Sequence, residues 1–95
     1  MNIKMIESMS GESAKTIQII VEVVRVKEVE PRSGSTIAFV EIRDSSGELE
    51  CIVFPEVYRS YKSVFYEGAK VEIEGRVNLA ENPRKLFPSK ATICT

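Results

Sequence analysis

The sequence predicts an all-β domain, a small five-stranded Greek-key barrel with one capping helix between the third and fourth strands. Three observations support this fold class. Residues 35–54 hold two runs of β-branched and aromatic residues around the sequence Asp44-Ser45-Ser46-Gly47, a pattern typical of a β-hairpin. Residues 16–29 are dense in isoleucine and valine. Two further strand-like runs follow an amphipathic segment that begins at Pro55.

Length and composition are those of one folded domain. The chain has 95 residues, of which 43% are hydrophobic and 28% are charged. Residues 1–15 are polar and without sustained periodicity, so we expect a flexible tail or the remnant of a linker from a longer protein, with the domain at residues 16–95. No apolar run approaches the roughly 20 residues that span a bilayer, and the first residues lack the apolar centre of a signal peptide. We therefore expect a cytoplasmic protein.

The first predicted strand, residues 16–29, changes the parity of its apolar side chains midway. One parity is held by Ile17, Ile19, Val21 and Val23, and the other by Val24 and Val26. Such a change indicates a bulge or a bend that lets one strand serve two sheets, as small closed barrels require. A long amphipathic helix is the alternative, but the density of β-branched residues disfavours it.

The hairpin strands are predicted at residues 37–43 and 49–54, after a loop at residues 30–35. In the turn, Asp44 is expected to accept a hydrogen bond from nearby backbone and Gly47 to take a positive φ. Alternation places inside the barrel Ala38, Val40, Ile42, Leu49, Cys51 and Val53. The reverse parity would bury Phe39 instead.

A helix is predicted from Pro55, a favoured first residue, to the end signal at Gly68. Its apolar face would be formed by Val57, Tyr58, Tyr61, Val64 and Phe65. We expect the aromatic members of this face to plug one end of the barrel.

The fourth strand is predicted at residues 70–79 and the fifth at residues 85–93. The fourth alternates cleanly, and Gly75 on its inward parity is expected to permit the close strand packing of a narrow barrel. Pro88 confines the fifth strand to a sheet edge or a bulge, because proline has no N–H for the ladder.

Three strands, one helix and two strands is the element order of an OB-fold. Several segments carry a more specific likeness: Ala38-Phe39-Val40-Glu41-Ile42-Arg43-Asp44, Ser46-Gly47, Val53-Phe54-Pro55-Glu56-Val57-Tyr58, Glu67-Gly68 and Glu74-Gly75-Arg76-Val77. They resemble the OB-fold nucleic-acid-binding domain near the C-terminus of the bacterial DNA polymerase III alpha subunit, over residues 16–77.

This resemblance implies a module that binds single-stranded nucleic acid, with single-stranded DNA expected ahead of RNA. Its partners would be the rest of a DNA polymerase or replication subunits, and it would keep the template strand near the enzyme. The family's first loop is often rich in lysine, whereas residues 29–34 here hold one basic residue, Arg32. We therefore expect weak, salt-sensitive binding.

The predicted site lies on the outer face of the second and third strands, where OB-folds bind oligonucleotides. Phe39 and Phe87 are the candidates for base stacking, and Arg43 would meet a phosphate on the same face as Phe39. The alternative for Phe39 is packing against a neighbouring loop or domain, and for Phe87 burial in the core. The candidate phosphate contacts nearer the last loop are Arg76, Arg84 and Lys85, with Arg32 of the first loop as a lesser addition.

Charge supports a second hypothesis, a structural or protein-interaction OB domain. The net charge is −1, and the outer face of the hairpin sets Glu41, Glu48 and Glu50 against Arg43. Such a face repels phosphates and would dock on another domain or subunit.

The sequence contains no constellation for catalysis, metal or cofactor binding. It has no histidine, and its two cysteines, Cys51 and Cys94, do not form a disulfide framework or a metal-ligand pair. We expect a non-catalytic domain without cofactor or small-molecule substrate.

Overall fold

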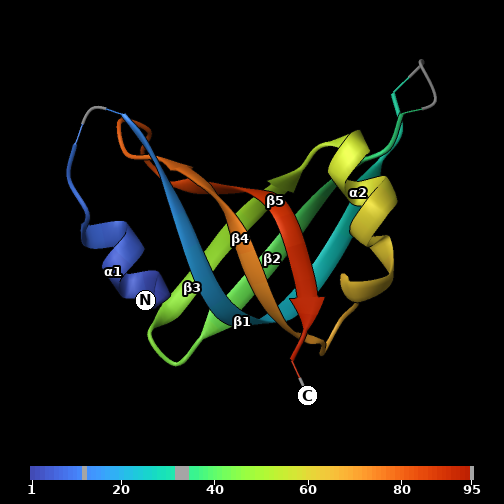
Figure 1. The fold of residues 1–95 in the computed structure, drawn as a ribbon, viewed down its shortest axis with the longest axis horizontal. Helices are drawn as coiled ribbons and strands as arrows, with labels where there is room; N and C mark the ends of the chain where they lie inside the picture. The colour runs from blue at the N-terminus through green and yellow to red at the C-terminus, as the bar shows by residue number, and fades with distance from the viewer. Residues whose placement is uncertain (12, 32–34, 95) are drawn as a thin grey trace.

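The chain forms five strands: β1 (Ala14–Val29), β2 (Ile37–Asp44), β3 (Gly47–Val53), β4 (Lys70–Asn78) and β5 (Lys85–Ile93). This computed structural model describes residues 1–11, 13–31 and 35–94. The strands close into a barrel in the order β1-β2-β3-β5-β4 (Figure 1). Every pairing is antiparallel except the short parallel pairing of β3 with β5, which joins Glu50 to Lys85 and Cys51 to Leu86. The predicted barrel, with one helix between β3 and β4, is confirmed.

The predicted parity change in β1 is a bulge at Val24. The register with β2 passes from Val23 opposite Ile42 to Arg25 opposite Glu41, so Val24 has no partner. Before the bulge β1 pairs with β4, and after it β1 continues along β2. One long strand therefore contributes to both sides of the barrel.

The predicted inward residues of β2 and β3 are all buried, so the parity that leaves Phe39 outside the core is correct. Cys51 is among these core residues, and its burial, reinforced by the charge of Glu50, raises the pKa of its thiol. Both cysteines are free thiols.

The β2–β3 turn confirms one expectation and corrects another. Asp44 accepts hydrogen bonds from the backbone N–H and the hydroxyl of Ser46, at 2.7 Å and 2.5 Å. Gly47 does not take a positive φ, so that prediction was wrong. The reversal is made by Ser45 and Ser46, while Gly47 already pairs with Asp44 as the first residue of β3.

The helix between β3 and β4, α2 (Pro55–Tyr61), begins at the predicted proline but ends earlier than expected. A 3₁₀ turn, η1 (Lys62–Val64), follows. The residues after Lys62 are serine, valine, phenylalanine and tyrosine, all weaker helix formers, and Phe65 turns into the core. Tyr58 and Phe65 are buried and Tyr61 packs against the core, so the predicted aromatic plug is confirmed.

The contact between β4 and β5 is close at Gly75. A Cβ atom there would lie 2.6 Å from the carbonyl oxygen of Phe87 and 2.8 Å from the Cα of Pro88. The register passes from Glu74 opposite Lys90 to Gly75 opposite Pro88, which leaves Ser89 as a bulge. The bulge expected at Pro88 is therefore confirmed, whereas the edge position is not, because β5 pairs with β3 and with β4.

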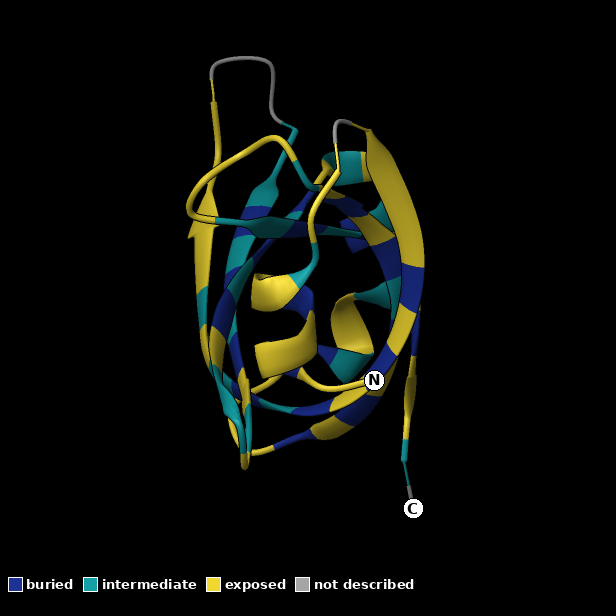
Figure 2. Cartoon of the chain, turned by 90° about the vertical axis from the view of Figure 1, so that its left-hand side faces the viewer, coloured by how far each residue is buried: buried dark blue, intermediate teal, exposed yellow. Residues whose placement is uncertain are grey.

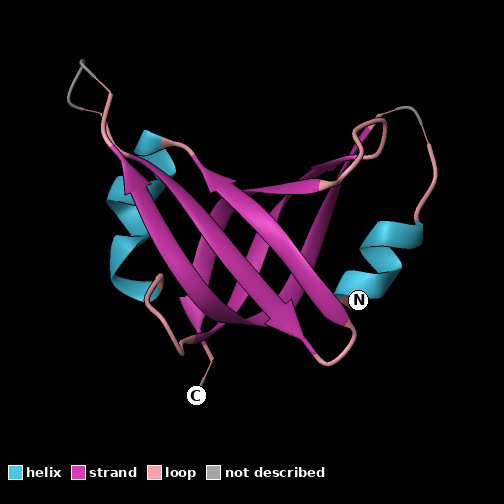
Figure 3. Ribbon diagram, turned by 180° about the vertical axis from the view of Figure 1, so that it is seen from behind, coloured by secondary structure: helices cyan, strands magenta, loops and turns pink. Residues whose placement is uncertain are grey.

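The N-terminal residues form a helix, α1 (Ile3–Ser8), where the sequence analysis expected a flexible tail. Figures 1 and 3 place α1 and α2 at opposite ends of the barrel, and Figure 2 shows the strands as a ring around α1. Ile3 and Ile6 are fully buried. The tail prediction is thus wrong for these residues, because a helix this short is stable only when docked and two isoleucines give little periodic signal. The start of the OB-fold domain at residue 16 stays a prediction.

Two side chains of the β2–β3 turn bind the first turn of α1. Asp44 Oδ2 accepts the N–H of Ile3 and Ser46 Oγ accepts the N–H of Lys4, both at 3.0 Å. Burial alone would raise the pKa of Asp44, but hydrogen bonds from Ser46, Ile3 and Gly47 outweigh it and lower that pKa. The carboxylate of Asp44 thus joins the turn to α1.

We expect acid to loosen α1 through Asp44. The folded-state pKa of Asp44 lies below the ordinary value of 3.8. The stabilisation of α1 by the Asp44 carboxylate is therefore fully present above that pH, and it is lost as the pH falls through the lower folded-state pKa. The amide signals of Ile3 and Lys4, followed by NMR from about pH 6 to about pH 2, should shift in this window. Asp44→Asn should weaken α1 docking by about 1–2 kcal/mol at neutral pH and abolish the transition.

The control for this titration is Glu48→Gln, which removes an exposed carboxylate from the same hairpin. This variant should keep the wild-type transition. Unchanged α1 signals in the wild-type protein throughout the acid range would contradict the role of Asp44.

No helix in the described part of the chain is long and apolar enough to cross a membrane.

Candidate nucleic-acid interface

Four apolar side chains line up on the outer surface of the barrel, and we call them the aromatic strip: Phe39, Ile52, Phe54 and Phe87. Phe39 of β2 is the cross-strand partner of Ile52 of β3. Cys51 and Leu86 are paired inward-facing residues of β3 and β5, so the residues that follow them, Ile52 and Phe87, face outwards on neighbouring strands.

The strip ends in a stacked aromatic pair. The rings of Phe54 and Phe87 are nearly parallel, at an interplanar angle of 8° and a centroid distance of 5.8 Å. Phe54 is 51% exposed, and the other members of the strip are half-buried. An exposed aromatic ring offers a surface for base stacking, and Phe54 combines this exposure with the neighbouring apolar side chains of the strip, which makes this the best stacking surface among the described residues.

Two cations border the strip in the cross-strand register. Lys27 of β1 lies opposite Phe39, and Arg76 of β4 lies opposite Phe87. Both are exposed, and neither forms an ion pair within the described residues. The structure thus places the predicted residues Phe39, Phe87 and Arg76 in one cross-strand row and adds Lys27.

The other predicted cations are engaged by protein groups. Arg43 Nε lies 3.3 Å from Glu22 Oε1, and Lys85 Nζ lies 3.0 Å from Glu50 Oε1. Arg84 donates to the carbonyl oxygens of Met9 and Glu81, so it holds the β4–β5 loop to the segment after α1. Arg32 lies outside the described residues.

The hairpin face is less acidic than its own sequence indicates. Glu50 is paired with Lys85, and Glu41 Oε1 lies 4.0 Å from Arg25 Nη1. Arg43 is itself paired with Glu22. Cations from β1 and β5 therefore offset Glu41 and Glu50, two of the three carboxylates that a count along β2 and β3 finds unpaired, whereas Glu48 has no ion pair within the described residues.

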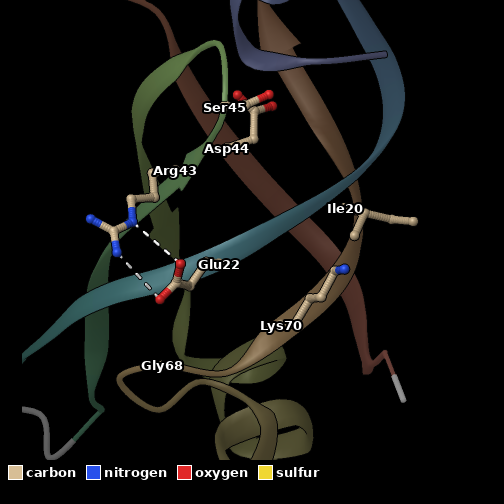
Figure 4. Close-up of a pocket in the computed structure, with 7 residues that line it drawn as sticks. All are labelled: Ile20, Glu22, Arg43, Asp44, Ser45, Gly68 and Lys70. Atoms are coloured by element: carbon tan, nitrogen blue, oxygen red, sulfur yellow. Dashed lines mark hydrogen bonds and ion pairs between the residues drawn. The ribbon is translucent and has the colours of Figure 1, made fainter.

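A hollow of about 640 Å³ lies around Arg43, at the other end of β2 from the strip. Figure 4 shows the guanidinium of Arg43 directed at the carboxylate of Glu22, with Lys70 on the far side of β1. The hollow is lined by Ile20, Glu22, Arg43, Asp44, Ser45, Gly68 and Lys70. Its two cations are balanced by two carboxylates and it has no aromatic ring, so it is a poorer match to a nucleic acid than the strip.

Residues 17–93 match the model of a family described as an OB-fold nucleic acid binding domain. The chain belongs to this family. The expected resemblance is also confirmed, because the OB-fold domain is 29% identical over 69 residues to DNA polymerase III subunit alpha of Bacillus subtilis (strain 168). That match covers 73% of the chain and 6% of the polymerase subunit.

Two solved structures share the fold of this OB-fold domain. Asparaginyl-tRNA synthetase from Pyrococcus horikoshii superposes with a TM-score of 0.68 at 20% identity, over 88% of this chain and 20% of that one. The mitochondrial single-stranded DNA binding protein Rim1 from S. cerevisiae superposes with a TM-score of 0.62 at 15% identity, over 85% and 94%. At these identities the likeness concerns the fold.

Sequence reasoning missed three members of the candidate interface of this OB-fold domain. Parity along β3 already placed Ile52 and Phe54 outside the barrel, but the stacking of Phe54 on Phe87 joins residues 33 apart in the sequence. Lys27 faces Phe39 only because of the bulge in β1. Within the described residues, no group of histidine, cysteine, aspartate or glutamate is arranged to hold a metal ion.

Proposed function

We propose that this domain binds single-stranded DNA on the aromatic strip, as a non-catalytic module of a cytoplasmic replicative DNA polymerase. It would hold the template strand near the enzyme. The observation that supports this most is the stacked, half-exposed pair of Phe54 and Phe87 in line with Phe39. The similarity to a polymerase subunit favours DNA over RNA.

The dimensions of the strip suit a short stretch of bases. It crosses three neighbouring strands, a width of roughly 10 Å, which is room for about two or three stacked bases. Each stack on an aromatic ring contributes about 1–3 kcal/mol. Because Lys27 and Arg76 are its only unpaired bordering cations among the described residues, we expect low affinity and a small salt dependence.

Phe54→Ala should weaken binding of a short oligo-dT strand by about tenfold or more at low salt, since it removes one stacking ring. The measurement is an NMR titration of the labelled domain at low and at higher salt, with shifts expected at Phe39, Ile52, Phe54 and Phe87. Tyr66→Ala is the matched control, because Tyr66 is 53% exposed but lies before β4, outside the strip. It should bind as the wild-type protein does. A matched RNA strand measures the preference for DNA.

A second candidate function is docking of another protein. An apolar strip that lies beside two ion pairs, Arg25–Glu41 and Lys85–Glu50, also suits a protein interface. The partner would be the rest of the polymerase or another replication subunit. Absence of any DNA-induced shift in the wild-type domain at low salt, with shifts on the strip when a polymerase subunit is added, would reject DNA binding in favour of docking.

A further inference from the structure

A smaller hollow, of about 220 Å³, lies between the start of β2 and α2. It is lined by Ser35, Thr36, Pro55, Tyr58, Arg59 and Lys62. We propose that this hollow binds a backbone phosphate of the same DNA strand whose bases lie on the aromatic strip. The inference rests on the proposed function and extends it to the side of the barrel covered by α2.

The lining groups have the chemistry of an anion site. Arg59 and Lys62 are three residues apart and so project from one face of α2 and the turn after it. Ser35 and Thr36 add hydroxyl donors from the opposite wall. No carboxylate lines this hollow, whereas each of three other surface hollows is lined by at least two carboxylates. These carboxylates belong to Glu22 and Asp44 in the first, to Glu7, Glu48 and Glu50 in the second, and to Glu72 and Glu74 in the third.

The hollow directly continues the aromatic strip. Ala38 pairs with Val53, so the residues just before β2 lie beside those just after β3. Thr36 precedes β2 by one residue, and Pro55 follows the exposed ring of Phe54. A DNA strand that leaves the strip over Phe54 therefore meets the mouth of the hollow at the next protein residue, Pro55.

Arg59 is available to a ligand. Its side chain is exposed, and it makes no side-chain hydrogen bond or ion pair within the described residues. This distinguishes Arg59 from Arg43, Arg84 and Lys85, which protein groups already bind.

Lys62 is held in position by a small polar network. Its Nζ lies 3.5 Å from Glu28 Oε2 and 5.9 Å from the ring centroid of Tyr58, and the Tyr58 hydroxyl donates to the same carboxylate oxygen at 2.6 Å. The hydrogen bond from Tyr58 and the charge of Lys62 lower the pKa of Glu28. An ammonium group has three N–H donors, so Lys62 can bind Glu28 and a phosphate together. Two cations against one carboxylate leave the site positive.

The test compares Arg59→Gln with Lys70→Gln on two strand lengths. Lys70 is an exposed cation of the hollow around Arg43, so its variant makes the same charge change away from α2. An oligo-dT of about four nucleotides should occupy the strip alone, and one of about twelve should also reach the hollow. For the longer strand, Arg59→Gln should weaken binding about 3- to 10-fold at low salt and reduce the slope of log K against log salt by about 0.7. Arg59→Lys should retain most of the affinity.

Each outcome decides one point. Equal affinities of Arg59→Gln and Lys70→Gln for the longer strand would overturn the phosphate site, while wild-type binding of the short strand would still support the strip. Loss of both lengths in Arg59→Gln, together with a lower melting temperature, would mean that the substitution disturbs α2, and would also overturn it. If the wild-type domain binds neither strand, the proposed function itself fails and the phosphate site with it.

Discussion

Replacing Gly75 with alanine is expected to destabilise the barrel by about 3 kcal/mol, near the upper end of overpacking effects. The added Cβ would meet the carbonyl oxygen of Phe87 at 2.6 Å and the Cα of Pro88 at 2.8 Å. These are backbone atoms of the paired strand, so they can move away only if β4 and β5 separate. Urea unfolding of the variant beside the wild-type protein measures the loss.

The chain offers two glycine controls for this prediction. Gly47→Ala should be nearly neutral, because its nearest neighbours would be 3.5 Å away and its φ is not positive. Gly68→Ala should cost about 1–2 kcal/mol for a conformational reason alone, since its φ is +88° and nothing lies within 4 Å. Equal losses at Gly75 and Gly47 would show that the close contact between β4 and β5 relaxes freely.

Ile6→Ala should lower the free energy of unfolding by about 2–4 kcal/mol. Ile6 is fully buried at the end of the barrel that α1 covers. A helix of six residues has little stability of its own, so the loss cannot exceed the docking free energy of α1, beyond which α1 undocks as a unit. Denaturant unfolding gives the total, and hydrogen exchange of the α1 amides shows whether they open ahead of the strands.

Met5→Ala is the matched control on the same helix, because Met5 is 49% exposed. Its effect should stay within about 0.5 kcal/mol. If Ile6→Ala were as mild as Met5→Ala, α1 would contribute nothing to the barrel, and its isoleucines would not belong to the core.

The strands could be predicted because one face of each is buried. Burial forces a period of two, so Ala38, Val40 and Ile42 revealed the parity of β2, and the break at Val24 revealed the bulge. α1 could not be predicted in the same way. Its two buried isoleucines form no repeat, and the groups that fix its N-terminus, Asp44 and Ser46, lie about 40 residues away in the sequence.

The site was predictable where it depends on parity and not where it depends on neighbours. Alternation along β2 favours an outward Phe39, whereas for Phe87 burial in the core stays open until the pairing of Leu86 with Cys51 places Phe87 outside. The engagement of Arg84 could not, because its partner, the carbonyl of Met9, lies 75 residues earlier. The electrostatics of the hairpin face likewise depend on Arg25 and Lys85, which belong to neighbouring strands.

The parallel pairing of β3 with β5 has a thermodynamic consequence. It joins the two strands through two residue pairs, whereas the other four pairings of the barrel each join seven or more. The aromatic strip crosses this junction, with Ile52 and Phe54 on one side and Phe87 on the other. A ligand bound over the strip would therefore contact both β3 and β5 and hold together the shortest strand pairing of the barrel. Such a ligand, at 100 times its Kd, adds about 2.7 kcal/mol to the free energy of unfolding. A ligand bound to the strip would thus be detected as slower opening of the barrel and a higher Tm.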